Sequence, residues 1–280
     1  MIQSASATPA EPVPQHSLRL RILSSLVLVP VALAAVWLGG LYLVTLTITA
    51  AAVMAWEWAR LCGGGAVGRI GAGVVGMVSF TVLGAALHGV GTGIMLAVLS
   101  ALGVWVIARQ EARPEAEWLA AGVLWVALPC VMLLWLAPGV EGRDLLLWIF
   151  AVVWATDIGA YVVGRCLGGP RLAPSWSPRK TWAGLVGGMV FAAFAGWAAG
   201  HLLAVPAILP LVLLSAGLAI IEQFGDLAES VAKRRFGVKD TSALIPGHGG
   251  LLDRLDGLLA VIAAVALLSL VGGGSVLEWR

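Results

Sequence analysis

Charged residues are scarce in this sequence. Asp, Glu, Lys and Arg make up only 11% of its 280 residues, whereas hydrophobic residues make up 60%. Soluble globular chains carry about 25% charged residues, and a fold of this size could not bury so much apolar surface away from water. The composition therefore excludes a soluble protein and predicts an all-α polytopic membrane protein. The formal net charge is only +2, and we expect no nucleic-acid partner.

Cysteine is nearly absent as well. The three cysteines, Cys62, Cys130 and Cys166, form no Cys-x-x-Cys or Cys/His cluster, so we expect no zinc site of the usual spacing. All three lie in or near apolar segments, which argues against disulfides. We interpret them as apolar helix residues.

Long apolar segments are, by contrast, abundant. A helix that crosses a bilayer requires about 20 mainly apolar residues, and nine segments of the sequence come close to this length. The predicted spans are about 20–38, 41–60, 70–88, 91–108, 118–137, 145–165, 184–203, 206–232 and 256–274. The third and fourth segments meet at Gly89, where the count is most open to error.

The residues before the first span have a different composition. Residues 1–17 are rich in Pro, Ser and Ala, and we predict that they form a disordered tail. The apolar run after Arg21 could also be a signal peptide that ends near Ala34. Pro30 and the many later spans favour a retained first helix instead.

The distribution of basic residues predicts the orientation in the membrane. With nine spans, all but two of the 17 Lys and Arg residues fall on the side of the N-terminus, and only Arg143 and Arg280 fall on the other. Cytoplasmic loops are enriched in Lys and Arg. We therefore expect a cytoplasmic N-terminus and an external C-terminus, in a bacterial cell membrane. A wrong count would scramble this bias, so the bias also supports nine helices.

The two halves of the chain differ in polar content. Residues 18–150 are predicted to form N-terminal transmembrane helices, and residues 151–280 a C-terminal catalytic region, because carboxylates and basic residues enter the spans mainly there. Ionisable residues inside a membrane are costly and usually functional. Asp157 in the sixth span is one of them, although a carboxylate satisfied by a neighbouring helix is an alternative interpretation.

The eighth span carries a polar stripe toward its C-terminal end. Spacings of three and four residues place four polar side chains on one helix face: Glu222, Asp226, Ser230 and Lys233. A solvated helix end would explain Glu229 and Lys233. It explains Asp226 poorly, because an apolar run closely precedes this residue, and we therefore predict that Asp226 belongs to a functional site.

A polar segment follows and leads into the ninth span. Its candidate site residues are Lys233, Arg234, Lys239, His248, Gly249, Gly250, Asp253, Arg254 and Asp256. Two carboxylates three residues apart share a helix face and can bind divalent cations through oxygen. A Gly-rich turn lets backbone N–H groups approach phosphate, and basic residues neutralise it. Together these elements predict a metal–triphosphate site on the cytoplasmic side.

A second basic loop lies between the sixth and seventh spans. It contains Ser177, Arg179 and Lys180 in the run Ser-Pro-Arg-Lys-Thr. These charges could serve only to orient the protein. The run opens a helix, however, and a helix N-terminus attracts anions, so we interpret it as a contact to a phosphate or a lipid headgroup.

The segment from Ser230 to Asp256 resembles the signature of the phosphatidate cytidylyltransferases, or CDP-diacylglycerol synthases. Three upstream runs resemble that family as well: residues 154–164, 177–182 and 225–230. The similarity is strong over about 154–260, whereas the first half agrees mainly in hydropathy and in Glu57. Ala183 departs from the pattern, since the family often has Glu or Gln there. This puts a role for that side chain in doubt and leaves the Asp and Lys set intact.

The resemblance implies an enzyme that makes CDP-diacylglycerol and pyrophosphate from CTP and phosphatidate with Mg²⁺, and it suggests a homodimer. We expect Asp226, Asp253 and Asp256 to be catalytic and to bind two divalent ions. Lys233 and His248 are the other expected catalytic residues. The expected substrate contacts are Lys180, Arg179, Ser177, Arg234, Lys239, Arg254, Ser230, Gly249, Gly250 and Asp157.

Other functions are also compatible with the sequence. A related CTP-dependent polyprenol or phytol kinase would transfer the γ-phosphate of CTP, and a related synthase would use an archaeal ether lipid as acceptor. An ion-coupled transporter would use Asp157 and Asp226 as a cation relay. Short and nearly uncharged outer loops argue against the transporter, because they offer little polar access from that side.

Overall fold

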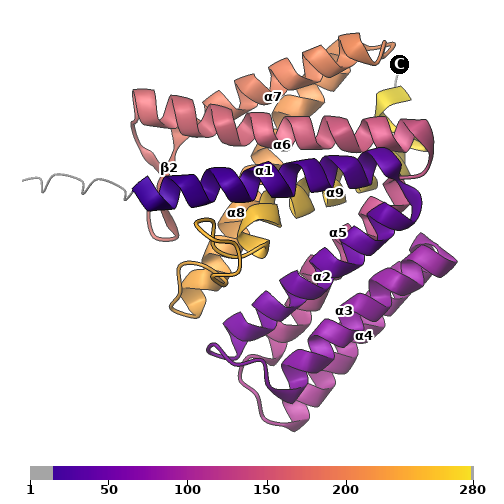
Figure 1. The fold of residues 1–280 in the computed structure, drawn as a ribbon, viewed down its shortest axis with the longest axis vertical. Helices are drawn as coiled ribbons and strands as arrows, with labels where there is room; N and C mark the ends of the chain where they lie inside the picture. The colour runs from indigo at the N-terminus through magenta and orange to yellow at the C-terminus, as the bar shows by residue number, and fades with distance from the viewer. Residues whose placement is uncertain (1–14, 279–280) are drawn as a thin grey trace, which may run out of the picture.

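The computed structural model describes residues 15–278, and most of them are helical (Figure 1). The helices are α1 (Gln15–Leu38), α2 (Gly40–Cys62), α3 (Gly68–His88), α4 (Val90–Gln110), α5 (Ala116–Leu136), α6 (Gly139–Leu167), α7 (Trp182–Leu202), α8 (Ile208–Arg235) and α9 (Leu252–Gly272). A hairpin joins α6 to α7, and its strands are β1 (Arg171–Ala173) and β2 (Ser177–Thr181). A short 3₁₀ helix, η1 (Val276–Glu278), ends the described chain.

These helices confirm the predicted class of protein. Eight of the nine helices in residues 15–278, α2 to α9, are long and apolar enough to cross a membrane, and α1 has a shorter apolar part, Leu23–Leu38. Their ends lie close to the predicted ones, because apolar length and polar boundary residues are both visible in a sequence. Gly89, with a φ of 89°, separates α3 from α4, so the two closely spaced spans are separate helices.

The helix α1 begins at Gln15, so it includes the last three residues of the segment 1–17 that was predicted to be a disordered tail. Polar residues are tolerated in the first turn of a helix, whose N–H groups can face water. Residues 1–14 and 279–280 lie outside the described part of the chain. The rest of the predicted tail and Arg280 lie there too.

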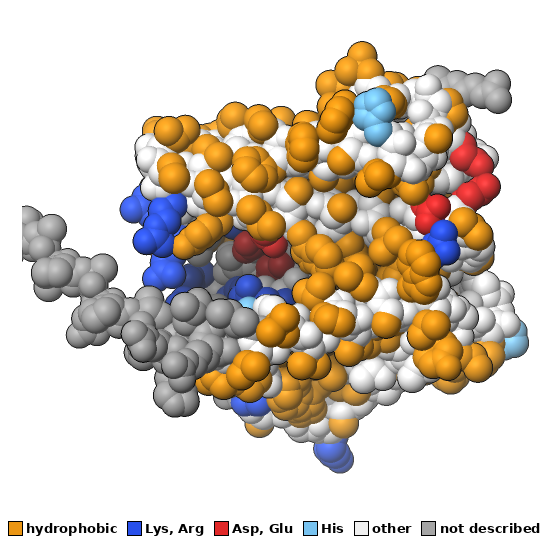
Figure 2. Space-filling view, turned by 45° about the horizontal axis from the view of Figure 1, so that its top comes forward, with side chains coloured by type: hydrophobic (Ala, Val, Ile, Leu, Met, Phe, Trp, Pro, Cys, Tyr) orange, Lys and Arg blue, Asp and Glu red, His pale blue; other side chains and the backbone are white. Residues whose placement is uncertain are grey.

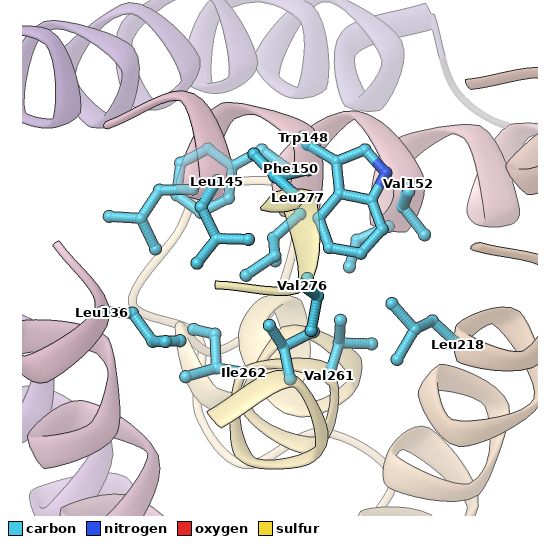
Figure 3. Packing of buried hydrophobic residues seen from close by; sticks show 14 of the residues in the cluster. Leu136, Leu145, Trp148, Phe150, Val152, Leu218, Val261, Ile262, Val276 and Leu277 are labelled. Atoms are coloured by element: carbon cyan, nitrogen blue, oxygen red, sulfur yellow. The ribbon is translucent and has the colours of Figure 1, made fainter. Parts of the chain in front are cut away.

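Two apolar cores hold the helices together. The first includes Trp58, Val78 and Val123 from α2, α3 and α5. The second lies between α6, α8 and α9, and η1 places Val276 and Leu277 in it (Figure 3). Contacts between α5 and α9 join the two groups. Lipid is as apolar as these side chains, so tight packing rather than removal from water stabilises such cores.

Glycines let α8 and α9 approach each other closely. A Cβ on Gly225 of α8 would lie 2.8 Å from the carbonyl oxygen of Asp256. In the other direction, a Cβ on Gly257 of α9 would lie 2.8 Å from Cγ of Glu222. Small residues at a crossing allow such approach in membrane proteins. The crossing places carboxylates of α8 beside those of α9.

The connection from α6 to α7 is more regular than the basic loop predicted there. The two strands pair antiparallel, with Arg171 opposite Thr181 and Ala173 opposite Ser177. Thr181 ends β2 and caps α7, because its Oγ1 accepts a hydrogen bond of 3.0 Å from the backbone N–H of Gly184. The run predicted to open the seventh helix therefore does so, and the strand gives its side chains fixed directions.

Enzyme fusions test the orientation, which stays a prediction. We expect alkaline phosphatase to be active when fused after Arg280 and inactive when fused after Gly64, between α2 and α3. The reporter needs disulfides that form only outside the cytoplasm, and the basic residues favour a cytoplasmic Gly64. The reverse pattern would mean the opposite orientation. Equal activity of both fusions would mean that a helix between them does not cross.

Candidate active site

Acidic and basic side chains gather in a hollow of the surface. Figure 2 shows acidic side chains deep in this hollow, Lys and Arg side chains around it, and hydrophobic side chains over the neighbouring faces. Polar contacts in this part of the molecule join α6, β2, α8 and α9. Charged groups at membrane depth must satisfy one another, because lipid offers them no partners.

Lys180 connects the hairpin to α8. Its Nζ lies 2.7 Å from Oδ2 of Asp226 and donates a hydrogen bond of 2.8 Å to Oε1 of Gln223. The amide of Gln223 donates to Glu222 at 2.7 Å, and the carboxyl group of Glu222 interacts with that of Asp157 on α6. Three predicted site residues are therefore brought together. Gln223, which was not predicted, connects Lys180 to Glu222 through hydrogen bonds.

Lys233 is the centre of a second cluster, between α8 and α9. Its Nζ lies 3.2 Å from Oε2 of Glu229 and 2.7 Å from Oδ1 of Asp253. Glu229 is only 1% exposed, and its carboxyl group interacts with that of Asp256. Its Oε1 has no hydrogen-bond partner within residues 15–278. A solvated helix end is therefore the wrong interpretation of Glu229 and Lys233, because both are buried against α9. Their spacing of four residues was the signal in the sequence that could have indicated this ion pair.

Asp253 accepts four hydrogen bonds. Lys233 donates to Oδ1, and the backbone N–H of Gly250 donates to Oδ2 at 2.9 Å. The backbone N–H and the hydroxyl of Thr241 also donate to Oδ2, at 2.9 and 3.0 Å. A carboxylate offers about four lone-pair positions, so protein donors use most of those on Asp253. This residue fastens the loop after α8 to the first turn of α9.

A buried carboxylate from the first half of the chain reaches the same loop. Glu57 of α2 is fully buried, and its Oε1 accepts hydrogen bonds from the hydroxyl of Ser242 at 2.6 Å and from the N–H of Leu251 at 2.9 Å. Its Oε2 accepts from the N–H of Leu252 at 2.7 Å. Glu57 is absent from the predicted site. An acidic residue inside an apolar span was a signal that could have indicated it.

The Gly-rich turn packs against α1. Gly247 and Gly249 have φ values of 79° and 87°, which glycine adopts without strain. Nδ1 of His248 lies 2.7 Å from Oγ of Ser24 in α1, and Arg254 donates to the carbonyl oxygen of His248 at 3.0 Å. The structure thus brings the turn and Arg254 together, as predicted, and adds Ser24, which was not predicted.

The remaining predicted substrate contacts are more peripheral. Arg179 and Lys239 are exposed, and Ser177 is half-buried at the start of β2. Arg234 is exposed as well, and its Nε donates to the carbonyl oxygen of Trp176 at 3.3 Å. This bond connects the end of α8 to the tip of the hairpin.

The carboxylates suit a magnesium ion in their chemistry. No group of three or more Asp, Glu, His or Cys side chains within residues 15–278 is arranged as a ready metal site. Of the predicted ligands, Asp226 accepts from Ser230 at 3.3 Å and pairs with Lys180 at 2.7 Å, and Asp253 is held by protein donors. Mg²⁺ prefers oxygen ligands. Asp226, Asp256 and Glu229 offer carboxylate oxygens, and among the described residues Oε1 of Glu229 has no hydrogen-bond partner.

Known proteins resemble this chain over most of its length. The sequence profile of the Cytidylyltransferase family matches residues 19–271. A phosphatidate cytidylyltransferase of Brucella suis is 38% identical over 267 residues, which cover 91% of this chain and 93% of the relative. One of Pseudomonas aeruginosa is 35% identical over 272 residues, which cover 91% and 98%. One of Haemophilus influenzae is 45% identical over 127 residues, or 44% of each chain.

Replacing Lys233 tests the second cluster. Lys233→Met leaves Glu229 and Asp253 without their shared cation, and removing one partner of a buried ion pair typically costs about 3–5 kcal/mol. We expect the midpoint of thermal unfolding in detergent to fall clearly below that of Lys239→Met, whose side chain is exposed. Adding Glu229→Gln should recover part of the loss. A wild-type midpoint in Lys233→Met would show that the pairing does not stabilise the fold.

Proposed function

The chain belongs to the cytidylyltransferase family, and on this premise we propose that it transfers the cytidylyl group of CTP to phosphatidate. The products are CDP-diacylglycerol and pyrophosphate, so the enzyme is a nucleotidyltransferase of phospholipid biosynthesis. The observation that supports this most is the pairing of Lys180 and Lys233 with carboxylates inside the region that the family profile covers.

This reaction requires charge neutralisation and positioning more than acid–base chemistry. A phosphate oxygen of phosphatidate attacks the α-phosphorus of CTP, and a new P–O bond forms. The bond from the α-phosphorus to the oxygen of the β-phosphate breaks, which releases pyrophosphate. The attacking phosphate is already ionised near neutral pH, so no strong general base is required. Cations stabilise the negative charge on the phosphate oxygens.

The two clusters can supply these cations and hold a metal. Lys180 and Lys233 are proposed to bind phosphate oxygens, together with backbone N–H groups of the Gly-rich turn. Asp226, Asp256 and Glu229 would hold two Mg²⁺ ions, while Asp253 orients the loop. Bound there, the ions would neutralise phosphate charge and orient the triphosphate.

A hollow at membrane depth suits one soluble and one lipid substrate. CTP comes from water and phosphatidate stays in its leaflet, so the site needs a polar interior next to lipid. Hydrophobic side chains flank the hollow (Figure 2), and the basic side chains around it would attract both anionic substrates. We place its opening at the cytoplasmic face of the bacterial inner membrane, since the distribution of Lys and Arg favours that side.

CTP labelled at the α-phosphate tests the reaction. Protein purified in detergent and given phosphatidate and Mg²⁺ should label the lipid and release one pyrophosphate for each labelled lipid, and EDTA should stop both. In a parallel assay with CTP labelled at the γ-phosphate, label in the lipid would identify a kinase instead. No transfer, by protein that still binds CTP, would mean that the acceptor or the reaction is different. The relatives do not favour a kinase or a transporter.

Neutral substitutions test the metal ligands. Asp226→Asn and Asp256→Asn each remove a charged oxygen donor. We expect kcat to fall about 10- to 100-fold or more, and the Mg²⁺ concentration for half-maximal rate to rise. Asp144→Asn is the matched control. Asp144 pairs with Arg143 at 3.0 Å near the start of α6, whereas the site residue of this helix, Asp157, lies nearer its end. Wild-type rates in either site variant would remove that residue from the metal site.

A further inference from the structure

The first turn of α9 carries two of the proposed site carboxylates but has no capping side chain of its own. Asp253 and Asp256 lie in or next to this turn, and the residue before the helix is Leu251, which makes no side-chain cap. The first N–H groups of a buried helix require acceptors. The directions of both carboxylates therefore depend on whatever accepts these N–H groups.

Glu57 accepts them from another helix. It receives the N–H groups of Leu251 and Leu252, and the hydroxyl of Ser242, from 185 to 195 residues further along the chain. A carboxylate at a helix N-terminus also interacts favourably with the helix dipole. Glu57 is 0% exposed, so water does not compete for these bonds.

Glu57 and Asp253 hold the same stretch of chain from two sides. Thr241 and Gly250 donate to Asp253, while their neighbours in sequence donate to Glu57. The space between the two carboxylates is filled. A Cβ on Gly250 would lie 2.1 Å from Oγ1 of Thr241 and 2.7 Å from Oε1 of Glu57. A change at Glu57 is therefore transmitted to the residues that orient Asp253.

We propose that Glu57 is a positioning residue for the cytidylyl transfer, an inference that rests on the proposed function. It holds the loop that fixes Asp253, and Asp253 fixes Lys233 at 2.7 Å. Glu57 acts through these contacts and not on the substrates. This role explains why α2 carries a buried acidic residue that contacts the start of α9.

Glu57→Gln tests this role. The amide keeps the size of the side chain but places N–H groups against N–H donors, so the N-terminus of α9 loses an acceptor. We expect kcat to fall about 10- to 100-fold and the Mg²⁺ requirement to rise, with a smaller change in the KM for CTP. Hydrogen–deuterium exchange should become faster in peptides that contain Leu251 and Leu252.

Two further variants separate positioning from general stability. Ser100→Ala removes a buried hydrogen bond of 3.2 Å to Thr81 within the group of α2 to α5, away from the loop. It should lower the unfolding midpoint and leave kcat unchanged. Ser242→Ala removes one of the three bonds to Glu57 and should lower kcat by a smaller factor than Glu57→Gln does. It also serves as the test if Glu57→Gln does not fold.

The outcomes are distinct. A wild-type kcat in Glu57→Gln, or in Ser242→Ala if the first variant does not fold, would overturn the proposal. An equal loss of kcat in Ser100→Ala would also overturn it, because any weakening of the helix group would then suffice. If the wild-type protein itself transfers no cytidylyl group, the proposed function fails. The exchange rates at Leu251 and Leu252 would still decide whether Glu57 holds the start of α9.

Discussion

The pairing of Lys233 with two carboxylates is the interaction on which the rest of the site depends. A charged group at membrane depth is stable only when other groups compensate it. Lys233 meets this requirement with Glu229 on its own helix and Asp253 on the next. Asp253 also accepts hydrogen bonds from the loop after α8, so the ammonium group of Lys233 connects two helices and this loop. Glu57 extends the connection to α2, because it accepts a hydrogen bond from the start of α9.

Alternating lysines and carboxylates reconcile stability with the proposed chemistry. Carboxylates alone would repel CTP and phosphatidate, and lysines alone would be costly inside a membrane. In the two clusters each lysine has a carboxylate within 3.2 Å. Such a site keeps its charges compensated, and it still offers cations for phosphate and oxygens for magnesium. Glycines at the crossing of α8 and α9 make the short distances sterically possible.

The sequence predicted the helices better than it predicted their contacts. Apolar length and polar boundaries are local properties, so the spans lie close to their predicted positions. Asp226 was also predicted, because a charge inside an apolar span is conspicuous. Lys233 and Asp253 were predicted from the polar segment between the eighth and ninth spans. The burial of Glu229 was not, since spacing alone does not show which helix face meets a neighbour. The hairpin and the partners of Glu57 depend on pairing between segments that no local pattern specifies.

The contact between Glu57 and the start of α9 has a consequence for how the protein is made. Glu57 enters the membrane early in synthesis, whereas its partner Leu252 is added 195 residues later. Ribosomes add about 5–20 residues per second, so the side chain of Glu57 waits roughly 10–40 s for its native hydrogen-bond donors in α9. During that interval the carboxyl group of Glu57 lacks the backbone N–H groups of Leu251 and Leu252 that it binds in the folded protein. A membrane chaperone or protease that detects such groups could distinguish unfinished from finished molecules.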